Sequence, residues 1–382
     1  MNFPVKSKIP SIFTKAFILV AGANFFYSLS HAYFFLLPLY IKSLGGDEAI
    51  IGIIMGSMGF CSMFMIPLMG VLMDRMWTKK GFFLVGAGLM AFISLAYLSL
   101  DSLFVPAFML LRILQGASFA LCLVSAGALM ADILPKERMA QGLGYYGVFI
   151  LVTHAIGPSI GELIVKAYGF KALFTLAFFF SILAFLAAMA IPGIGPERST
   201  ESSTSLFSLI RKRQMGIPIL TTIIFGAGFG SVLVFIPTFM KSFGMSVGPF
   251  FIAYTMSAIG IRFTRADLSD VLGRRAVILP SLFAFALSIF GLSAFGLFSR
   301  VQTLGLPFLV GISALFGLSH GLLYPTMNAL TFDVTDTKDR GKAMGLFSGG
   351  FNVGVTTSAI GLGLVAREWL SLIHISEPTR PY

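Results

Sequence analysis

Apolar residues gather in long runs along the chain, and charged residues interrupt them only at short intervals. A helix needs about 20 apolar residues to cross the roughly 30 Å hydrocarbon core of a bilayer, and each run is close to that length or longer. The pattern therefore predicts an all-α membrane protein with eleven spans. The predicted spans are 15–41, 49–73, 81–100, 103–131, 140–167, 172–195, 216–240, 248–266, 276–298, 303–331 and 343–366.

Composition agrees with this pattern, because 57% of the residues are hydrophobic and only 11% are charged. A soluble domain carries about 25% charged residues, so a soluble protein is excluded. The formal net charge of +11 comes from cations spread over short loops. Nucleic-acid binding would require a clustered basic face, so we expect no nucleic-acid partner and take the lipid bilayer as the main surrounding.

The distribution of Lys and Arg predicts the orientation in the membrane. If the N-terminus is cytoplasmic, most of the 27 basic residues fall in cytoplasmic loops, as the positive-inside rule requires. The loops on the other side then hold only Lys42, Lys166, Lys171, Lys241, Arg300 and Arg367. We therefore expect a multi-pass protein of the cell inner (cytoplasmic) membrane.

Residues for catalysis, metal binding or cofactor attachment are not evident in the sequence. Cys61 and Cys122 lie inside apolar runs and are interpreted as packing residues. The chain has no C-x-x-C, H-E-x-x-H or nucleophile-elbow motif. We expect no enzyme activity, no metal and no cofactor.

Internal sequence repeats divide the chain into two related halves. The polar stretch at 196–215 predicts a cytoplasmic linker between residues 1–195 and residues 216–369. Asp74 and Asp270 are 196 residues apart (270 − 74), and Asp132 and Asp333 are 201 apart (333 − 132), each pair in the same context. Residues 138–149 also match 340–351, an offset of 202 (340 − 138). Three repeated motifs that occur in the same order in both parts of the chain indicate parallel, pseudo-symmetric halves.

The last residues, 370–382, break the pattern of the rest of the chain. Their sequence from Leu370 to Arg380 is similar to the translation of a transposase adapter used in sequencing libraries. We expect this tail to be non-native, with a twelfth helix missing from the second half. A natural amphipathic terminus is the alternative.

A charged turn between two apolar runs is the most specific motif. It reads Gly70-Val71-Leu72-Met73-Asp74-Arg75-Met76-Trp77-Thr78-Lys79-Lys80, and its repeat reads Asp270-Val271-Leu272-Gly273-Arg274-Arg275. Both resemble the loop between helices 2 and 3 of the major facilitator superfamily, G-x-L-A-D-R-x-G-R-K. Trp77 and Thr78 depart from that pattern. The resemblance implies two six-helix bundles, a small-molecule pathway between them at mid-membrane, and a protein that works as a monomer.

Arg112 lies about nine residues into the span 103–131, which we expect to be near the bilayer centre. A buried cation is costly there unless it faces a partner or an aqueous pathway. Arg112, Gln115 and Gly116 resemble the family pattern R-x-x-Q-G, which implies a role in proton coupling. An Arg held by helix carbonyls for packing alone is the alternative.

The span 140–167 resembles the family's antiporter pattern G-x8-G-x3-G-P-x2-G-G. Gly157, Pro158 and Gly161 follow that pattern, whereas Thr153 and Glu162 replace two of its glycines. Small residues allow close helix packing and proline weakens the helix ladder, so we expect this helix to bend and slide during gating. The resemblance favours export over import.

Charged residues at helix ends are candidate gating groups. The resemblance implies that Asp74 meets the N-terminus of the span 343–366, where a carboxylate gains about 0.3–1 kcal/mol. Arg340 would add to this contact, and Asp132 and Asp333 would receive Arg75 or nearby cations. Solvated loop charge is the alternative for each pair. The gating candidates are Asp74, Arg75, Asp132, Asp270, Arg274, Arg340, Gly157, Pro158 and Gly161.

Polar residues inside spans are candidate pocket groups. Asn24, Tyr27 and His31 share one helix face by their spacing. The family fold places the spans that hold them, and those that hold Gln115 and His320, along the pathway. The predicted substrate contacts are Asn24, Tyr27, His31, Gln115, His320 and Asn328.

These features together predict a proton-coupled exporter of a small hydrophobic or amphipathic molecule. The first span and the middle of 103–131 lack the acid that many drug exporters keep there, so the coupling groups are sought among Arg112, Glu162, His31 and His154. An importer or facilitator for a sugar or organic acid is the alternative within the same fold. A membrane-embedded enzyme or a receptor is the alternative from another class, and no motif supports it.

Overall fold

A computed structural model describes residues 11–75, 79–135, 138–192, 206–265, 267–299, 302–336 and 339–376. Side chains are not described at 73–75, 140, 206–207, 298–299, 302–304, 340 and 369–376. Within these residues the secondary structure is entirely helical. The first half holds α1 Lys15–Tyr33, η1 Phe34–Leu36, α2 Leu37–Ser43, α3 Glu48–Arg75, α4 Lys79–Tyr97, α5 Val105–Ile133 and α6 Met139–Met189. The rest holds α7 Leu206–Arg211, η3 Arg213–Met215, α8 Gly216–Ser242, α9 Gly248–Arg265, α10 Leu268–Val271, α11 Arg274–Ser293, α12 Phe295–Ser299, α13 Gln302–Asp333 and α14 Arg340–Ser376.

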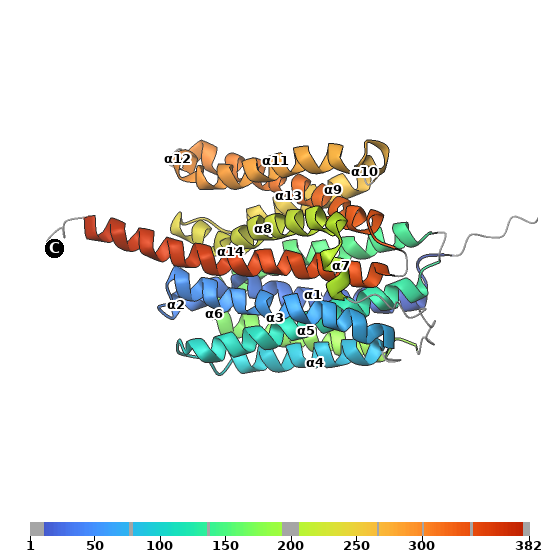
Figure 1. The fold of residues 1–382 in the computed structure, drawn as a ribbon. Coiled ribbons are helices and arrows are strands. Elements are labelled where there is room, and N and C mark those ends of the chain that lie inside the picture. The colour runs from blue at the N-terminus through green and yellow to red at the C-terminus, as the bar shows by residue number, and fades with distance from the viewer. Residues whose placement is uncertain are drawn as a thin grey trace, which may run out of the picture.

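The long helices lie side by side along one direction (Figure 1). In the described part of the chain, nine helical segments are long and apolar enough to cross a membrane. One of these, Gln141–Met189, contains two spans that meet at Gly169. The short α9 brings the number of spans to the eleven that the sequence predicts (9 + 1 + 1). It is less apolar than the others because it carries Arg262 and Arg265.

Helix boundaries follow from local chemistry. The Thr14 hydroxyl accepts a hydrogen bond from the Phe17 amide at 3.1 Å and caps α1, and Asp47 likewise accepts from the Ile50 amide at 2.7 Å at the start of α3. Gly169 has φ +79°, a conformation that only glycine adopts without strain, and this breaks α6 into two helices.

The two ends of the bundle are named here by one residue each. The Gly169 end, on the left in Figure 1, holds the turn at Gly169 together with α2 and α12. The Asp270 end, on the right, holds the start of α1, the short α7 and the turn at α10. By the distribution of basic residues, the Asp270 end is the one predicted to face the cytoplasm.

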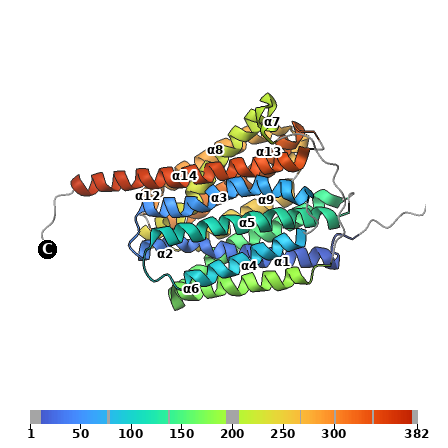
Figure 2. The ribbon, with the colours of Figure 1, turned by 60° about the horizontal axis from the view of Figure 1, so that its bottom comes forward.

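Two groups of helices pack within themselves and against each other. In the first half α1 packs on α6 and α3 on α5, and in the second half α8 packs on α14 and α9 on α13. The halves meet along α3 with α14, which run side by side in both ribbon views, and along α6 with α9 (Figure 2). At the Gly169 end α2 also lies against α8.

The same helix contact occurs once in each half. A Cβ on Gly116 of α5 would collide with the backbone carbonyl of Met58 on α3, and a Cβ on Gly317 of α13 would collide with that of Tyr254 on α9. Gly116 and Gly317 are 201 residues apart (317 − 116), and Met58 and Tyr254 are 196 apart (254 − 58). These are the offsets that the acidic turns predict, so the pseudo-symmetry extends from sequence to packing.

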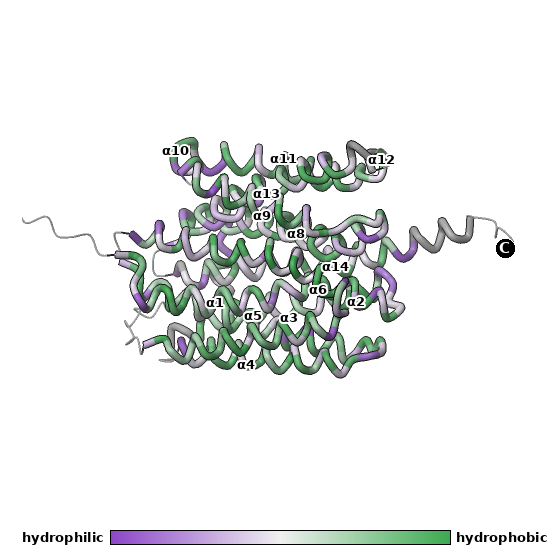
Figure 3. The backbone as a smooth tube through the Cα atoms, turned by 180° about the vertical axis from the view of Figure 1, so that it is seen from behind, coloured by the Kyte–Doolittle hydropathy of each residue, from purple (hydrophilic) through white to green (hydrophobic). Residues whose placement is uncertain are grey.

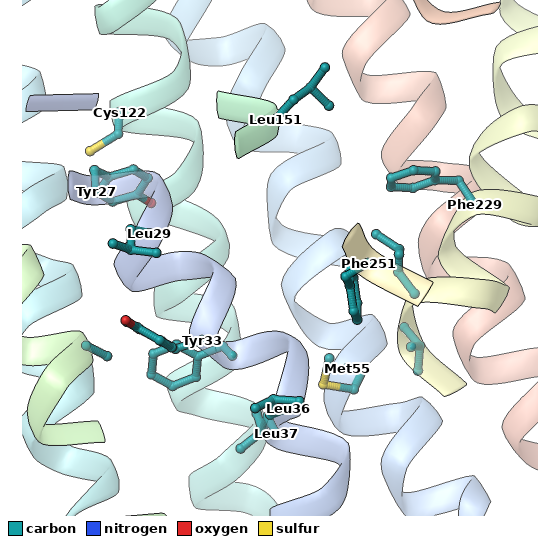
Figure 4. Close-up of a cluster of buried hydrophobic side chains, with 14 of the residues drawn as sticks. Tyr27, Leu29, Tyr33, Leu36, Leu37, Met55, Cys122, Leu151, Phe229 and Phe251 are labelled. Atoms are coloured by element: carbon teal, nitrogen blue, oxygen red, sulfur yellow. The ribbon is translucent and has the colours of Figure 1, made fainter. Parts of the chain in front are cut away.

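Apolar residues cover the outside of the bundle as well as its interior. Hydrophilic residues gather toward the two ends, and the length between them is largely hydrophobic (Figure 3). Figure 4 shows buried Leu36 and Met55 of the first half near Phe251 of the second. Large exposed apolar side chains are what a lipid-facing surface requires. They include Phe60, Phe64, Phe92, Phe179, Phe283 and Phe290.

The predicted linker and tail are described only in part. Residues 193–205 and 377–382 lie outside the described residues, and α14 continues as helix through Ser376. At the Gly169 end α14 extends beyond its neighbours (Figure 1). The domain limits and the non-native tail stay predictions.

Candidate functional site

Arg112 is buried, with 4% of its surface exposed. Its Nη1 donates to Gln115 Oε1 at 2.6 Å and its Nη2 to the carbonyl of Met55 on α3 at 3.5 Å. Arg112 Nε and Gln115 Nε2 have no hydrogen-bond partner among the described residues. Because α5 begins at Val105, Arg112 lies about 10 Å along the helix from that end, and its position near the bilayer centre stays a prediction.

His31 lies deeper, between α1 and α5. Its ring stacks on Phe119 of α5 at a centroid distance of 5.1 Å and meets the edge of Phe35 at 6.1 Å. Arg112 and His154 both act on His31 electrostatically, which places these three groups in one neighbourhood. His31 is partly exposed, and its Nδ1 has no hydrogen-bond partner in the part of the chain that the structure describes.

The second half contributes a matching cluster around His320. The Tyr254 hydroxyl and His320 Nδ1 are 3.4 Å apart, and the His320 ring stacks on Phe229 at 4.9 Å. His320 is buried, whereas Tyr324 one turn further along α13 is partly exposed. Asn328 is also partly exposed, and its Oδ1 has no partner.

Aromatic contacts join these two clusters across the boundary between the halves. Phe35 stacks on Phe251 of α9 with centroids 5.8 Å apart and an interplanar angle of 4°. His154 of α6 packs against Phe35 at 5.2 Å and against Tyr254 at 6.5 Å. We name His31, His154, Tyr254 and His320 the central cluster, which the Phe35–Phe251 pair covers on the side of the Gly169 end.

Arg262 flanks the central cluster on the other side. Its Nε donates to the Gly321 carbonyl of α13 at 3.4 Å, and its Nη1 lies 3.6 Å from where a Cβ on Gly147 of α6 would stand. It acts electrostatically on His154 and His320. Arg262 lies within the predicted span 248–266 but is not among the predicted site residues. Its position 14 residues into α9 (262 − 248) was the available indication that it belongs to the interior.

Two predicted pocket residues point into the first half. The Tyr27 hydroxyl is 3.1 Å from the Ser118 hydroxyl, which itself donates to the Gly86 carbonyl at 2.7 Å. Asn24 is buried one turn before Tyr27 on α1. Tyr27 thus links α1 to α5, whereas Gln115, His31 and Asn328 carry unpaired polar atoms.

Glu162 forms a contact between the halves at the Gly169 end. One carboxylate oxygen accepts from the Ser246 hydroxyl at 2.5 Å, the Val247 amide at 2.9 Å and the Gly248 amide at 3.3 Å. These groups form the N-terminus of α9, where unpaired amides and the helix dipole favour a negative charge. We call this the Glu162 contact.

Ion pairs occupy the Asp270 end. Lys79 Nζ donates to both Asp132 oxygens at 2.7 Å. In the second half Arg274 Nε donates to Asp333 at 2.9 Å, and its Nη1 contacts Asp270. The acids that end α5 and α13 therefore bind the cations that begin α4 and α11, as the repeat requires.

The predicted contact of Asp74 with the start of α14 is described only for the backbone. The side chains of Asp74, Arg75 and Arg340 lie outside the described residues. A Cβ on Gly345 would stand 3.1 Å from Pro67 Cα, so the end of α3 lies close to the start of α14.

The small residues of α6 pack within the first half. A Cβ on Gly157 would stand 2.5 Å from Ala32 Cβ of α1, and one on Gly161 would stand 2.9 Å from Leu36 Cδ1 and 3.1 Å from Tyr33 Cδ1. Pro158 lies inside the same helix. These glycines thus allow α6 to pack closely on α1, whereas Glu162 on the same helix contacts the other half.

The sequence model described as Major Facilitator Superfamily matches residues 17–266 and 263–375. The chain is 23% identical over 351 residues to the staphylopine export protein of Staphylococcus aureus strain Mu50, covering 88% of this chain and 86% of that one. It is 24% identical over 200 residues to the quinolone resistance protein NorA of Staphylococcus aureus, covering 51% and 50%. The solved structure of the nucleoside transporter NupG has the same fold, with a TM-score of 0.75 and 18% identity over 93% of this chain and 92% of that one. Two repeated helical halves, polar groups where they meet and this family match agree, and the chain belongs to the major facilitator superfamily of membrane transporters.

Proposed function

We propose that this transporter exports a small amphipathic molecule, coupled to proton entry, by alternating access between its halves. The observation that supports this proposal most is the central cluster, where polar groups of α1, α6, α9 and α13 meet at the boundary between the halves. A site so placed can be opened to either side by rocking one half against the other. The protein would act as a monomer with small-molecule substrate and protons as its partners.

Contacts at the Gly169 end support a state that is closed on that side. The Glu162 contact, the Phe35–Phe251 pair and the packing of α2 on α8 all join the halves there. In the described residues, α5 and α13 are not among the helix pairs that pack closely on each other. With the N-terminus cytoplasmic, this state would open to the cytoplasm and receive substrate from it.

A carried proton needs a group that both sides can reach in turn. Arg112 stays charged in the physiological range, so it can influence a proton site but not release the proton. Glu162 is engaged in the Glu162 contact at the Gly169 end, away from the central cluster. His31 and His154 lie centrally and are partly exposed, and an imidazole can both take up and release a proton, so we assign the carried proton to them.

The direction of transport rests on the two curated relatives, whose names describe export and drug resistance. An importer or facilitator for a sugar or organic acid would use the same arrangement of halves. One proton entering down about 100 mV and one pH unit supplies about 3.7 kcal/mol, which sustains a gradient of a few hundredfold for a neutral substrate.

Dye accumulation tests the proposal. Cells that lack their own exporters are loaded with ethidium, Nile red or carboxyfluorescein, with and without the chain. We expect lower accumulation of at least one dye, and an uncoupler should restore it. Raised accumulation would favour the importer, and three dyes unchanged by expression would contradict export.

A further inference from the structure

We infer that the substrate is an organic anion, a carboxylate on an aromatic or other apolar body. The inference rests on the proposed transport function and names its substrate class. Its basis is a central site that, among the described side chains, carries two guanidinium groups and no acid. It is distinct from a site for cationic drugs, which would need a carboxylate in the same place.

The charged groups around the central cluster are mainly positive. Of the sixteen acidic residues, only Glu162 falls inside a predicted span, five residues from its end (167 − 162). Its carboxylate is already engaged by the start of α9. Arg112 lies on one side of the cluster and Arg262 on the other.

The ionisable neighbours of both guanidinium groups lack negative charge at neutral pH. Tyr97 and His31 interact with Arg112, and Arg262 interacts with Tyr254, Tyr324, His154 and His320. A buried cation without a counter-ion is costly in an apolar medium. A bound anion would supply the missing charge.

Unpaired polar atoms mark where such an anion would be held. Arg112 Nε and Gln115 Nε2 are buried without partners, and His31 and His154 each leave Nδ1 unpaired. A guanidinium group presents two parallel N–H donors that match a carboxylate. The rings of Phe35, Phe119 and Phe251 offer flat apolar surfaces beside these donors.

An anionic substrate also agrees with the absence of a mid-span acid. A monovalent anion leaves an inside-negative cell in the direction that the membrane potential favours. Export then needs no carboxylate to compete with substrate for a proton. The histidines can still carry a proton inward in the return step.

Binding by the purified chain in lipid nanodiscs tests the inference with three probes of one shape. Indole-3-acetate is an anion, indole-3-acetamide is neutral and tryptamine is a cation. We expect indole-3-acetate to bind about tenfold or more tightly than the other two, because a charge-assisted hydrogen bond replaces a neutral one. Arg112→Gln and Arg262→Gln should remove this preference. Arg265→Gln, an exposed cation three residues after Arg262, is the matched control and should keep it.

Equal or tighter binding of the amide or the amine would overturn the inference, as would binding of none of the three at millimolar concentration. Retention of the anion preference in both Arg112→Gln and Arg262→Gln would also overturn it. The order of affinities for the three probes is measured on the unaltered chain, so this part of the test does not depend on the folding of a variant. Failure of the proposed function is separate, because it appears as unchanged accumulation of all three dyes in cells.

Discussion

Glu162 of α6 accepts a hydrogen bond from the Ser246 hydroxyl at 2.5 Å, so a charged acceptor joins the two halves of the protein at the Gly169 end. The family pattern has a glycine at the position of Glu162. A contact of carboxylate with helix N-terminus forms and breaks with little loss of apolar burial, which suits a gate that opens in every cycle.

Replacing Glu162 by glutamine should loosen the Gly169 end. Gln keeps an acceptor oxygen but loses the charge, which is worth about 1 kcal/mol at a helix N-terminus, so the closed population should fall about fivefold relative to the open one. The readout is maleimide labelling of Ser159→Cys, because Ser159 lies against Gly248 in this contact. The Glu162→Gln variant should label about fivefold faster.

The matched control is Glu48→Gln. Glu48 pairs with Lys42 at the same end but within the first half, so its loss leaves the contact between halves intact. Equal labelling rates in the Glu162→Gln and parent proteins would show that the Glu162 contact does not hold the gate.

Gly157 should tolerate no side chain. The Cβ of Gly157→Ala would press on Ala32 of α1, and overpacking of this kind costs about 1–3 kcal/mol. Gly144→Ala on the same helix meets nothing within 4 Å and serves as control. Thermal unfolding in detergent should show a lower Tm for Gly157→Ala only, and a Tm equal to that of the parent would contradict the packing.

The ion pairs at the Asp270 end should differ in strength. Lys79 and Asp132 have 23% and 16% of their side chains exposed, whereas Asp333 in the pair with Arg274 is 50% exposed. Solvent screening weakens exposed pairs, so double-mutant cycles in unfolding should give about 1 kcal/mol for the first pair and about 0.5 kcal/mol or less for the second. The reverse order would mean that burial does not set these energies.

Replacing His31 or His154 by glutamine should separate transport from proton coupling. Without a proton carrier, a transporter still exchanges substrate down its gradient but cannot accumulate it against one. Proteoliposomes with an imposed pH gradient should therefore show exchange at the parental rate and loss of uphill transport. Uphill transport that survives in both variants would exclude these histidines as carriers.

Much of the fold could be predicted from residue spacing. Apolar runs mark the spans, and the offsets of 196 and 201 residues that separate Asp74 from Asp270 and Asp132 from Asp333 recur in the packing of Gly116 and Gly317. Such features are local or repeat along the chain, so a single sequence is enough to reveal them.

The site was harder to predict because its contacts join residues far apart in the chain. Arg262 falls near the end of the predicted span 248–266, and only its neighbours on α6 and α13 show that it belongs to the site. The partner of Glu162 is 84 residues away (246 − 162), and no pattern links the two. The helix that carries Arg112 starts at Val105, two residues (105 − 103) after the predicted start, because helix starts are poorly marked in apolar runs.

Reciprocal movement of the two ends is the central claim, and paired spin-label distances test it most directly. One pair joins Tyr168 of α6 to Leu297 of α12 at the Gly169 end, and the other joins Leu143 of α6 to Val271 of α10 at the Asp270 end, all four being exposed positions. During turnover with an exported dye and a proton gradient, the first distance should gain a longer component while the second gains a shorter one. Two distances that stay unchanged, or that lengthen together, would contradict alternating access between these halves.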